Sequence, residues 1–162
     1  MKDEASGNSE HNLIEAADRS AVTKRFIPDN WAAPIPPPEY FPAHVFRVQT
    51  IELLRKSSLE WTEFYNGVFL DYYGMPHLRT HIHPNTFYID IPSKVAAIPG
   101  TGNNRIAFTY SEDVARFVAA TLDLKQWDQS YYIIGDTLSL NELLKLAEEA
   151  TGKFIWSRCP HY

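Results

Sequence analysis

Helix-like and strand-like segments alternate along this chain, and their order limits the fold more than any other feature of the sequence. The helix-like segments repeat apolar residues at helical spacing, and the strand-like ones are rich in β-branched and aromatic residues. The expected helices are residues 12–20, 43–58, 111–124 and 139–153, and the expected extended segments are residues 21–28, 59–65, 87–100, 105–110 and 131–134. Such alternation is typical of α/β folds with a largely parallel sheet.

The last two expected helices have the clearest boundaries. Ser111 is an expected N-cap, and the two acidic residues after it suit the positive end of a helix dipole. Ser139 and Glu142 have the spacing of a capping box, and Gly152 is an expected helix end. The side chains expected on the buried faces are Val114, Phe117, Val118, Thr121 and Leu122 of one helix and Leu143, Leu144 and Ala147 of the other.

Composition excludes several classes of partner and location. The 162 residues are 44% hydrophobic and carry a net charge of −5, and no basic run is longer than Lys24-Arg25, which argues against nucleic acid or an acidic membrane as the main partner. A single cysteine, Cys159, rules out an internal disulfide. The polar, acidic N-terminus is unlike a signal peptide, and no apolar run could span a bilayer, so we expect a cytoplasmic or nuclear protein.

Two segments are expected to have no regular structure. Residues 1–11 are predicted to be a disordered tail, and the five prolines in residues 33–42 predict an irregular loop.

Several short motifs suggest chemistry but fail a test of context. Gly100 and Gly102 resemble part of a dinucleotide fingerprint, yet a strand-like segment follows them where that fingerprint needs the N-terminus of a helix. A turn between extended segments is the better interpretation. Neither a Tyr-x-x-x-Lys pair nor a nucleophile elbow is present. His77, His81 and His83 lack the cysteine or nearby carboxylate that would complete a zinc site, so we interpret them as surface-loop residues.

The stretch LEWTEFYNGVFLDYYG, residues 59–74, leaves two interpretations open. A strand ending at Tyr65 is followed by the turn signal Asn66-Gly67 and then by a cluster of large rings. This is the pattern of an ordinary hairpin, and equally of a ligand crevice at the carboxyl end of a strand in an open α/β sheet. The run of Phe69, Leu70, Tyr72, Tyr73 and Met75 is most simply buried core.

Several stretches together resemble one family, the NmrA-like and isoflavone-reductase-like proteins, which are atypical short-chain dehydrogenases/reductases. The stretches are AVTKRFIPDNWA, LEWTEFYNGVFLDYYG, IPGTGNNRIAFTYSEDVARFVAATLD and YYIIGDTLSLNELLKLAEEATGK. Their sequences look closest to those of fungal members of the family. The resemblance covers residues 12–155 and implies a partial Rossmann-like, NAD(P)-binding domain that lacks the N-terminal βαβ unit with its glycine-rich loop. Residues 156–162 would then be a truncated C-terminal end.

The resemblance also implies a site. Pro28, Asp29, Tyr65, Asn66, Gly67 and Phe69 would contact NADP or NAD, and the Asn66-Gly67 turn would let the backbone pass close to the nicotinamide. Tyr73 would contact a small-molecule substrate. Arg47 stands where reductases of this family carry a catalytic lysine, and an arginine cannot readily exchange a proton.

Three hypotheses follow from the resemblance. The first is an NAD(P)-dependent reductase of the isoflavone-reductase type, which transfers hydride to a small unsaturated or aromatic substrate. The second is a non-catalytic regulator that senses NAD(P) and binds a protein partner, and Arg47 in place of lysine favours it. The third, favoured by the missing glycine-rich loop, is a truncated remnant that binds no cofactor. We expect little or no reductase activity from this chain.

Overall fold

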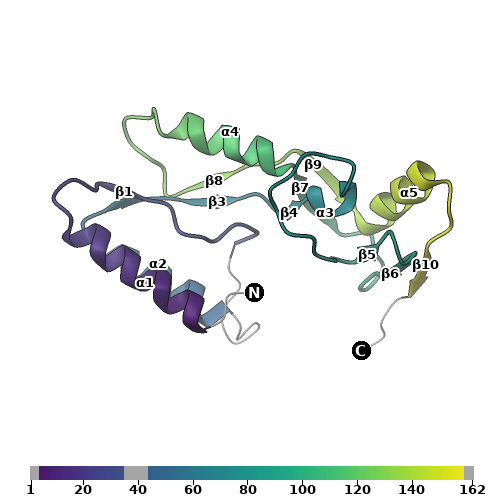
Figure 1. Ribbon diagram of the computed structural model, residues 1–162, viewed down its shortest axis with the longest axis horizontal. Coiled ribbons are helices and arrows are strands. Elements are labelled where there is room, and N and C mark those ends of the chain that lie inside the picture. The colour runs from purple at the N-terminus through teal and green to yellow at the C-terminus, as the bar shows by residue number, and fades with distance from the viewer. Residues whose placement is uncertain (1–3, 35–43, 159–162) are drawn as a thin grey trace. The chain divides into compact units, whose positions relative to one another are not determined.

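The alternation of helices and strands expected from the sequence is present in the structure, a computed structural model that describes residues 4–34 and 44–158 (Figure 1). The chain divides into two compact units. Unit 1 comprises Met1–Tyr65 and Thr121–Tyr132, and unit 2 comprises Asn66–Ala120 and Ile133–Tyr162. None of the helices in the described ranges has the length and apolar character needed to cross a membrane.

Unit 1 packs two helices beside short parallel strand pairs. Its elements are α1 (Glu4–Arg19), β1 (Arg25–Phe26), α2 (Val45–Lys56), β2 (Glu60–Trp61), β3 (Glu63–Tyr65) and β8 (Ser130–Tyr132). Strand β1 pairs in parallel with β2, and β3 pairs in parallel with β8. The buried apolar cluster joins the two helices to the start of β2 and consists of Ile14, Ala17, Ile51, Leu54 and Leu59.

The predicted disordered tail is wrong for residues 4–11, which form the first half of α1. Their polar composition suggested disorder, but long-range contacts hold the helix. The Thr50 hydroxyl donates to Glu10 Oε2 at 3.1 Å and lies 3.1 Å from His11 Nε2. Glu10 Oε1 also accepts the Asp29 amide at 2.7 Å. Partners 19 to 40 residues away in sequence are not visible to a local reading of composition.

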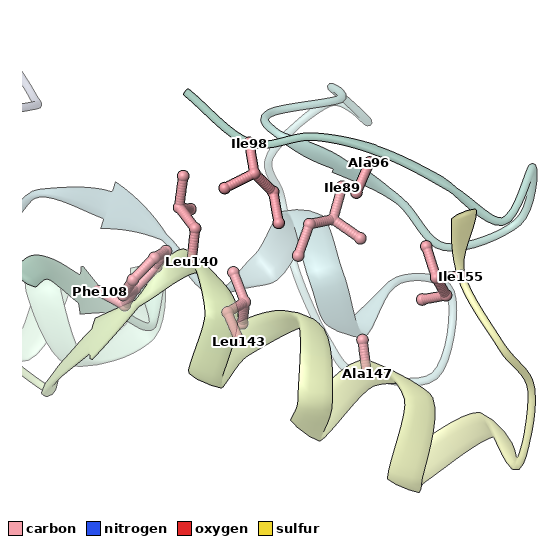
Figure 2. Close-up of a cluster of buried hydrophobic side chains, with 8 residues drawn as sticks. All are labelled: Ile89, Ala96, Ile98, Phe108, Leu140, Leu143, Ala147 and Ile155. Atoms are coloured by element: carbon pink, nitrogen blue, oxygen red, sulfur yellow. The ribbon is translucent and has the colours of Figure 1, made fainter. Parts of the chain in front are cut away.

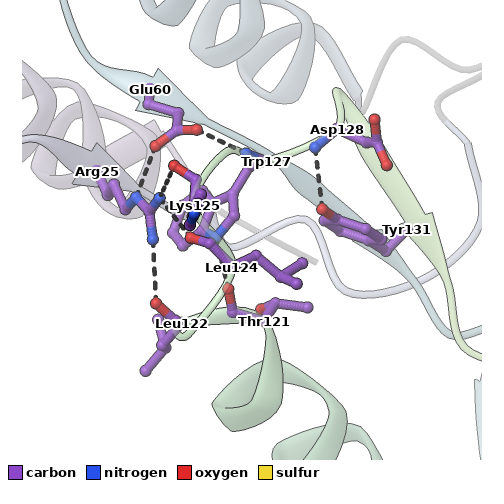
Figure 3. Close-up of polar contacts among 9 residues, drawn as sticks. All are labelled: Arg25, Glu60, Thr121, Leu122, Leu124, Lys125, Trp127, Asp128 and Tyr131. Atoms are coloured by element: carbon purple, nitrogen blue, oxygen red, sulfur yellow. Dashed lines mark hydrogen bonds and ion pairs between the residues drawn. The ribbon is translucent and has the colours of Figure 1, made fainter.

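A cation and a carboxylate fasten the loop before β8 to the strands β1 and β2 (Figure 3). Arg25 Nε donates to Glu60 Oε2 at 2.6 Å, and its Nη atoms donate to the carbonyls of Leu122, Leu124 and Lys125 at 2.8–3.1 Å. The guanidinium also lies 4.7 Å from the ring centroid of Trp127. Glu60 Oε1 accepts the Trp127 amide at 2.6 Å, so the pair fixes both ends of the loop.

Unit 2 contains two three-stranded sheets with helices beside them. Its elements are β4 (Val68–Phe69), α3 (Asp71–Gly74), β5 (Ile89–Asp90), β6 (Val95–Ala97), β7 (Arg105–Thr109), α4 (Ser111–Thr121), β9 (Asp136–Ser139), α5 (Leu140–Thr151) and β10 (Trp156–Arg158). One sheet has the order β4-β7-β9 and the other β10-β6-β5. In both units together the pairs are mostly parallel; only β5–β6 and β7–β9 are antiparallel among the named strands.

The apolar core of unit 2 lies between α5 and the strands β5 to β7 (Figure 2). Leu143 and Ala147 point from α5 toward Ile89 and Ala96 (Figure 2). The buried members are Ile89, Ala96, Ile98, Phe108, Leu140, Leu143, Ala147 and Ile155. The predicted capping box of α5 is confirmed, because Ser139 Oγ accepts the Glu142 amide and the Glu142 carboxylate accepts the Ser139 amide. Gly152 ends the helix in the left-handed region, as expected.

Other sequence predictions need correction or limits. The expected strand over residues 59–65 is divided into β2 and β3, which have different partners. On α4 only Val114 is buried, whereas Phe117 of the predicted apolar face is 59% exposed, and Leu122, which follows the helix, is 55% exposed. The Gly100-x-Gly102 loop joins β6 to β7, which confirms the turn interpretation. The predicted proline-rich loop lies largely outside the described residues, as do residues 159–162 of the expected C-terminal end, whereas residues 156–158 form β10.

Candidate functional site

The predicted site residues divide between the two units. Pro28, Asp29, Arg47 and Tyr65 belong to unit 1, and Asn66, Gly67, Phe69 and Tyr73 belong to unit 2. Their assignment to cofactor or substrate remains a prediction.

Arg47 is the centre of a hydrogen-bonded cluster in unit 1. It projects from α2, and its Nε donates to Asn30 Oδ1 at 3.0 Å while Nη2 donates to the Asn30 carbonyl at 2.8 Å. The Asn30 amide group donates in turn to Glu63 Oε1 at 3.2 Å. The other oxygen of Glu63 accepts the Tyr65 hydroxyl at 2.9 Å. Asn30 and Glu63 are 2% and 7% exposed, so the guanidinium is held by partners that are themselves fixed.

Secondary structure explains why these side chains meet. Glu63 and Tyr65 are two apart on β3 and therefore point to one face. Asn30 follows β1 by a few residues, and Ala32 forms an isolated parallel bridge with Tyr65, so the segment after β1 runs beside the end of β3. The cluster thus lies toward the carboxyl ends of parallel strands, the end at which open α/β sheets bind ligands.

The charges of the cluster favour binding over proton exchange. Burial lowers the pKa of the Arg47 guanidinium, while the carboxylates of Glu63 and Asp29 raise it, and an arginine stays charged near neutral pH. Burial, and then the hydrogen bond to Glu63, raise the pKa of the Tyr65 hydroxyl, so it stays protonated. Burial and then the charge of Arg47 lower the pKa of His44, which leaves that imidazole neutral at pH 7.

Pro28 and Asp29 lie at the end of β1, as the resemblance implied. Pro28 is fully buried, which makes its ring part of the packing. Asp29 is exposed, its amide donates to Glu10, and its carboxylate is close enough to Arg47 to influence the pKa of the guanidinium. Of these two residues, Asp29 is therefore the one that presents its side chain at the surface.

In unit 2, Thr109 holds together the backbone around Asn66. Its hydroxyl lies 2.8 Å from the carbonyl oxygens of both Asn66 and Ile133, and the Gly135 amide donates to it at 3.3 Å. Thr109 is 1% exposed and ends β7. One buried hydroxyl therefore connects three chain segments, a role that no sequence motif indicated.

Gly67 is required by packing. Its φ is +69°, and a Cβ there would lie 2.1 Å from the Ala107 carbonyl oxygen. In the structure, Gly67 therefore packs closely against strand β7. Contact of Gly67 with a nicotinamide remains a prediction.

Asn66 is fully buried and has an unpaired acceptor. Its side-chain amide nitrogen lies 3.3 Å from the Gly67 carbonyl, whereas its Oδ1 has no hydrogen-bond partner in the described part of the chain. Buried acceptors without partners are rare in folded proteins, and a bound group or water commonly supplies the missing donor.

Tyr73 lines two cavities of unit 2. The cavities have volumes of about 550 and 700 Å³, the size range of small-molecule sites, and Met75, Pro76, Ile91 and Pro92 line both as well. The Tyr73 hydroxyl donates to the Phe87 carbonyl at 2.9 Å, and burial raises its pKa. Phe69 is in edge-to-face contact with Tyr72 and is not among the residues that line either cavity.

A buried carboxylate, Asp71, lies outside the predicted set. It accepts hydrogen bonds from the Ser111 amide at 2.9 Å and from the hydroxyls of Ser111 and Thr80. Burial alone would raise the pKa of Asp71, but these hydrogen bonds outweigh it and lower the pKa below its usual value. These hydrogen bonds all come from other residues of the chain, so we interpret Asp71 as stabilising the start of α4.

Among residues 4–34 and 44–158, no group of three or more His, Cys, Asp and Glu side chains could hold a metal ion.

Sequence comparison finds relatives among fungal oxidoreductases, whereas no protein-family model matches the chain. Oxidoreductase BOA1 of Botryotinia fuckeliana is 32% identical over 148 residues, which are 90% of this chain and 49% of that protein. Oxidoreductase swnN of Metarhizium robertsii is 29% identical over 180 residues, or 94% of this chain and 52% of that protein. The chain spans about half the length of the relatives it matches.

Comparison with solved structures shows the fold. Leucoanthocyanidin reductase from Vitis vinifera matches 95% of this chain with a TM-score of 0.70 and 19% identity, over 53% of its own chain. AtPrR2 with NADP+ and (+)pinoresinol has a TM-score of 0.68 and 18% identity, over 94% of this chain and 50% of its own. UDP-glucuronic acid 4-epimerase from Bacillus cereus in complex with NAD has a TM-score of 0.69 and 18% identity, over 93% and 54%. The predicted partial Rossmann-like α/β fold is confirmed.

Proposed function

We propose, from the homology of this chain to fungal oxidoreductases, that it forms the nicotinamide side of an NAD(P)-dependent oxidoreductase. The observation that carries the proposal is the Arg47–Asn30–Glu63–Tyr65 cluster in unit 1. It presents a partly buried, permanently charged guanidinium toward the carboxyl ends of parallel strands, where α/β folds bind cofactors and substrates. Structural neighbours in complex with NADP+ or NAD support the same class of cofactor.

The residues fit one end of the cofactor better than the other. At the nicotinamide end, Arg47 and Tyr65 of unit 1 present polar groups near the ends of β1 and β3, and Asp29 carries an exposed carboxylate. The pyrophosphate has no matching cradle in this sequence, because the loop that contains Gly100 and Gly102 leads into β7 rather than into a helix. We therefore assign this chain contacts to NADP or NAD at the nicotinamide end only. When bound, the cofactor would supply the hydride.

Arg47 would act by binding negative charge. Its planar guanidinium is fixed by Asn30, so it can stabilise an oxygen that becomes negative during reduction of a small unsaturated or aromatic substrate. It does not exchange protons near neutral pH. Within unit 2, Tyr73 lines both cavities, and we propose it as a contact for a small ligand there.

A second candidate function is NAD(P) sensing without catalysis, with a protein as the partner. The observation that favours it is again Arg47, since a lysine at this position could have its pKa lowered enough to serve in proton transfer and an arginine could not. The charge pattern of the sequence continues to argue against nucleic acid or a membrane as the partner.

Turnover measurements test the proposal and separate the two functions. NADPH oxidation is followed with a panel of enones and quinones for the wild type and for Arg47→Met, Arg47→Lys and Arg55→Met. Arg55 is the matched control, because it is an exposed arginine on the same helix. If Arg47 stabilises an oxyanion, Arg47→Met lowers kcat/KM roughly a hundredfold and Arg55→Met leaves it unchanged. Arg47→Lys should add a new ionisation to the pH–rate profile.

Each outcome has a distinct meaning. Turnover that depends on Arg47 supports the oxidoreductase. Saturable NADPH binding with no turnover in any variant supports the sensor. Absence of NADPH binding, or turnover that Arg47→Met does not change, contradicts the proposal.

A further inference from the structure

The larger cavity of unit 2, of about 700 Å³, is lined by both apolar and basic side chains. Its apolar lining includes Leu143, Leu146 and Ala147 of α5, and Tyr73 and Pro92 line it as well. Leu146 is 48% exposed, so part of this apolar surface is open to an incoming molecule. A cavity of this size and lining suits a small organic ligand.

The ionisable groups that line this cavity favour an anion. They are Lys94, Lys153, His77 and the Tyr73 hydroxyl, and no carboxylate lines it in the described part of the chain. Both lysines are exposed, and neither forms an ion pair with another described residue. Two ammonium groups with no carboxylate among the other described lining residues are notable in a chain whose net charge is −5. A negatively charged ligand would gain from both.

The backbone holds Lys94 in an uncommon conformation at this cavity. Its φ is +57°, in the left-handed region that glycine or asparagine usually occupies. The turn between β5 and β6 fixes it, since the Lys94 amide donates to the Ile91 carbonyl at 3.2 Å and its own carbonyl accepts the Trp156 amide at 3.0 Å. A lysine in a backbone conformation that disfavours it is consistent with a functional role of its side chain, such as ligand binding.

The smaller cavity provides a contrast within the same unit. It shares Tyr73 and Pro92 but is lined by Asp90, Asn85 and Thr86, and neither lysine lines it. Asp90 Oδ1 accepts the Ser93 amide at 2.9 Å, so its carboxylate is fixed at this cavity. An anion should therefore be repelled from the smaller cavity and attracted to the larger one.

We propose that the larger cavity binds a small organic anion in which an apolar body carries one carboxylate group. The apolar body would lie against α5 and Tyr73, and the carboxylate would lie at Lys94 and Lys153. To take this ligand as the substrate rests on the proposed oxidoreductase function. The binding itself rests only on the cavity and its charges, so it can be tested without cofactor or turnover.

Calorimetric titration of the full chain with a matched pair of probes tests the proposal. The probes are naphthalene-2-carboxylate and the neutral naphthalene-2-carboxamide, which share one ring system. We expect the carboxylate to bind about tenfold more tightly at pH 7 and low salt. The double variant Lys94→Asn/Lys153→Gln should reduce the affinity for the carboxylate to that for the amide. Asparagine is chosen because it tolerates the left-handed backbone.

Two further variants control the result. Lys145→Gln removes a lysine of α5 that does not line the cavity and pairs with Glu149, so it should change neither affinity. Leu146→Ser should weaken both probes alike. If the Lys94 change lowers the melting temperature, Lys153→Gln alone gives the test, with a loss of about threefold for the carboxylate only. Equal affinity for the two probes, no saturable binding, or carboxylate binding that survives the loss of both lysines overturns the proposal. None of these outcomes depends on whether NADPH binds.

Discussion

The buried polar side chains of the two units perform different tasks. In unit 1, Asn30 and Glu63 bind other side chains and position Arg47. In unit 2, Thr109 binds the backbone carbonyls of Asn66 and Ile133, and Asp71 accepts the first amide of α4. The apolar clusters differ as well, with five buried members in unit 1 and eight in unit 2. In unit 2 the buried polar side chains Thr109 and Asp71 therefore bind backbone groups and stabilise the fold. In unit 1 the buried side chains of Asn30 and Glu63 instead hold one charged side chain, Arg47, in position.

The largest effect should come from the core of unit 2. Phe108 is fully buried on β7, so Phe108→Ala leaves a cavity and should lower the free energy of unfolding by about 3–5 kcal/mol. Urea denaturation measures the change. Phe154→Ala removes a side chain that is 77% exposed and should cost less than about 0.5 kcal/mol. Equal costs would mean that Phe108 does not belong to a packed core.

Gly67→Ala should have the next largest effect. A methyl group there meets the Ala107 carbonyl and must also adopt a positive φ, which together should cost about 2–4 kcal/mol. Gly100→Ala is the matched control. Gly100 has a φ of +59°, but a methyl group there would have open space for 4 Å around it, so only the backbone cost of about 1 kcal/mol applies. If the two variants are equally stable, the close packing against β7 is wrong.

Asp71→Asn should destabilise unit 2 by about 2 kcal/mol, since it weakens hydrogen bonds to a buried carboxylate. Thermal unfolding at pH 7 gives this value. Asp136→Asn, which alters an exposed aspartate of the same unit, is the control and should be nearly neutral. A neutral Asp71→Asn would show that the carboxylate is not needed at the start of α4.

The same residue predicts a pH dependence. Its hydrogen bonds lower the pKa of Asp71 in the folded chain below the usual value of 3.8, despite the opposing effect of burial. The folded state thus prefers the carboxylate, and its contribution to stability is complete well above pH 3.8 and is lost as the pH falls through the folded pKa. Between about pH 6 and pH 3 the wild type should lose more stability than Asp71→Asn.

The smallest of the four effects should come from unit 1. Arg25→Ala removes the contacts to Glu60, Trp127 and three carbonyls at a partly exposed site and should cost about 1–2 kcal/mol. Arg25→Lys should recover only part of this, because an ammonium cannot reproduce the planar fork. Arg19→Ala, at a 74% exposed arginine, is the control and should cost less than about 0.5 kcal/mol. Hydrogen exchange of residues 121–128 should rise in the Arg25 variants only.

Local patterns predicted much of the fold. Apolar spacing placed α2, α4 and α5 within a few residues, and the capping box of α5 followed from Ser139 and Glu142 alone. Features that depend on distant partners were missed. Residues 4–11 are helical because Glu10 and His11 meet Thr50, and α4 exposes Phe117 although its periodicity suggested a buried face.

The candidate site was predictable only in part. The resemblance selected Arg47 and Tyr65, which the structure joins through Glu63 and Asn30. Asn30 and Glu63 themselves carry no motif, because their roles arise when the segment after β1 lies beside β3. The resemblance placed Gly67 close to the nicotinamide, which stays a prediction, and only the structure identifies β7 as its neighbour. The partners of Asn30, Glu63 and Gly67 depend on which strands lie side by side, and this pairing is set by tertiary packing rather than by local sequence.

Thermal unfolding of the full chain with increasing NADPH tests the central claim most directly, with Arg47→Met measured in parallel. At a hundredfold excess over its Kd, the cofactor should add about 2.7 kcal/mol, which raises the melting temperature by roughly 5–10 °C. We expect a cooperative transition that shifts upward in the wild type and clearly less in Arg47→Met at equal NADPH. An unshifted transition, or an equal shift in both proteins, would contradict a nicotinamide site organised by Arg47.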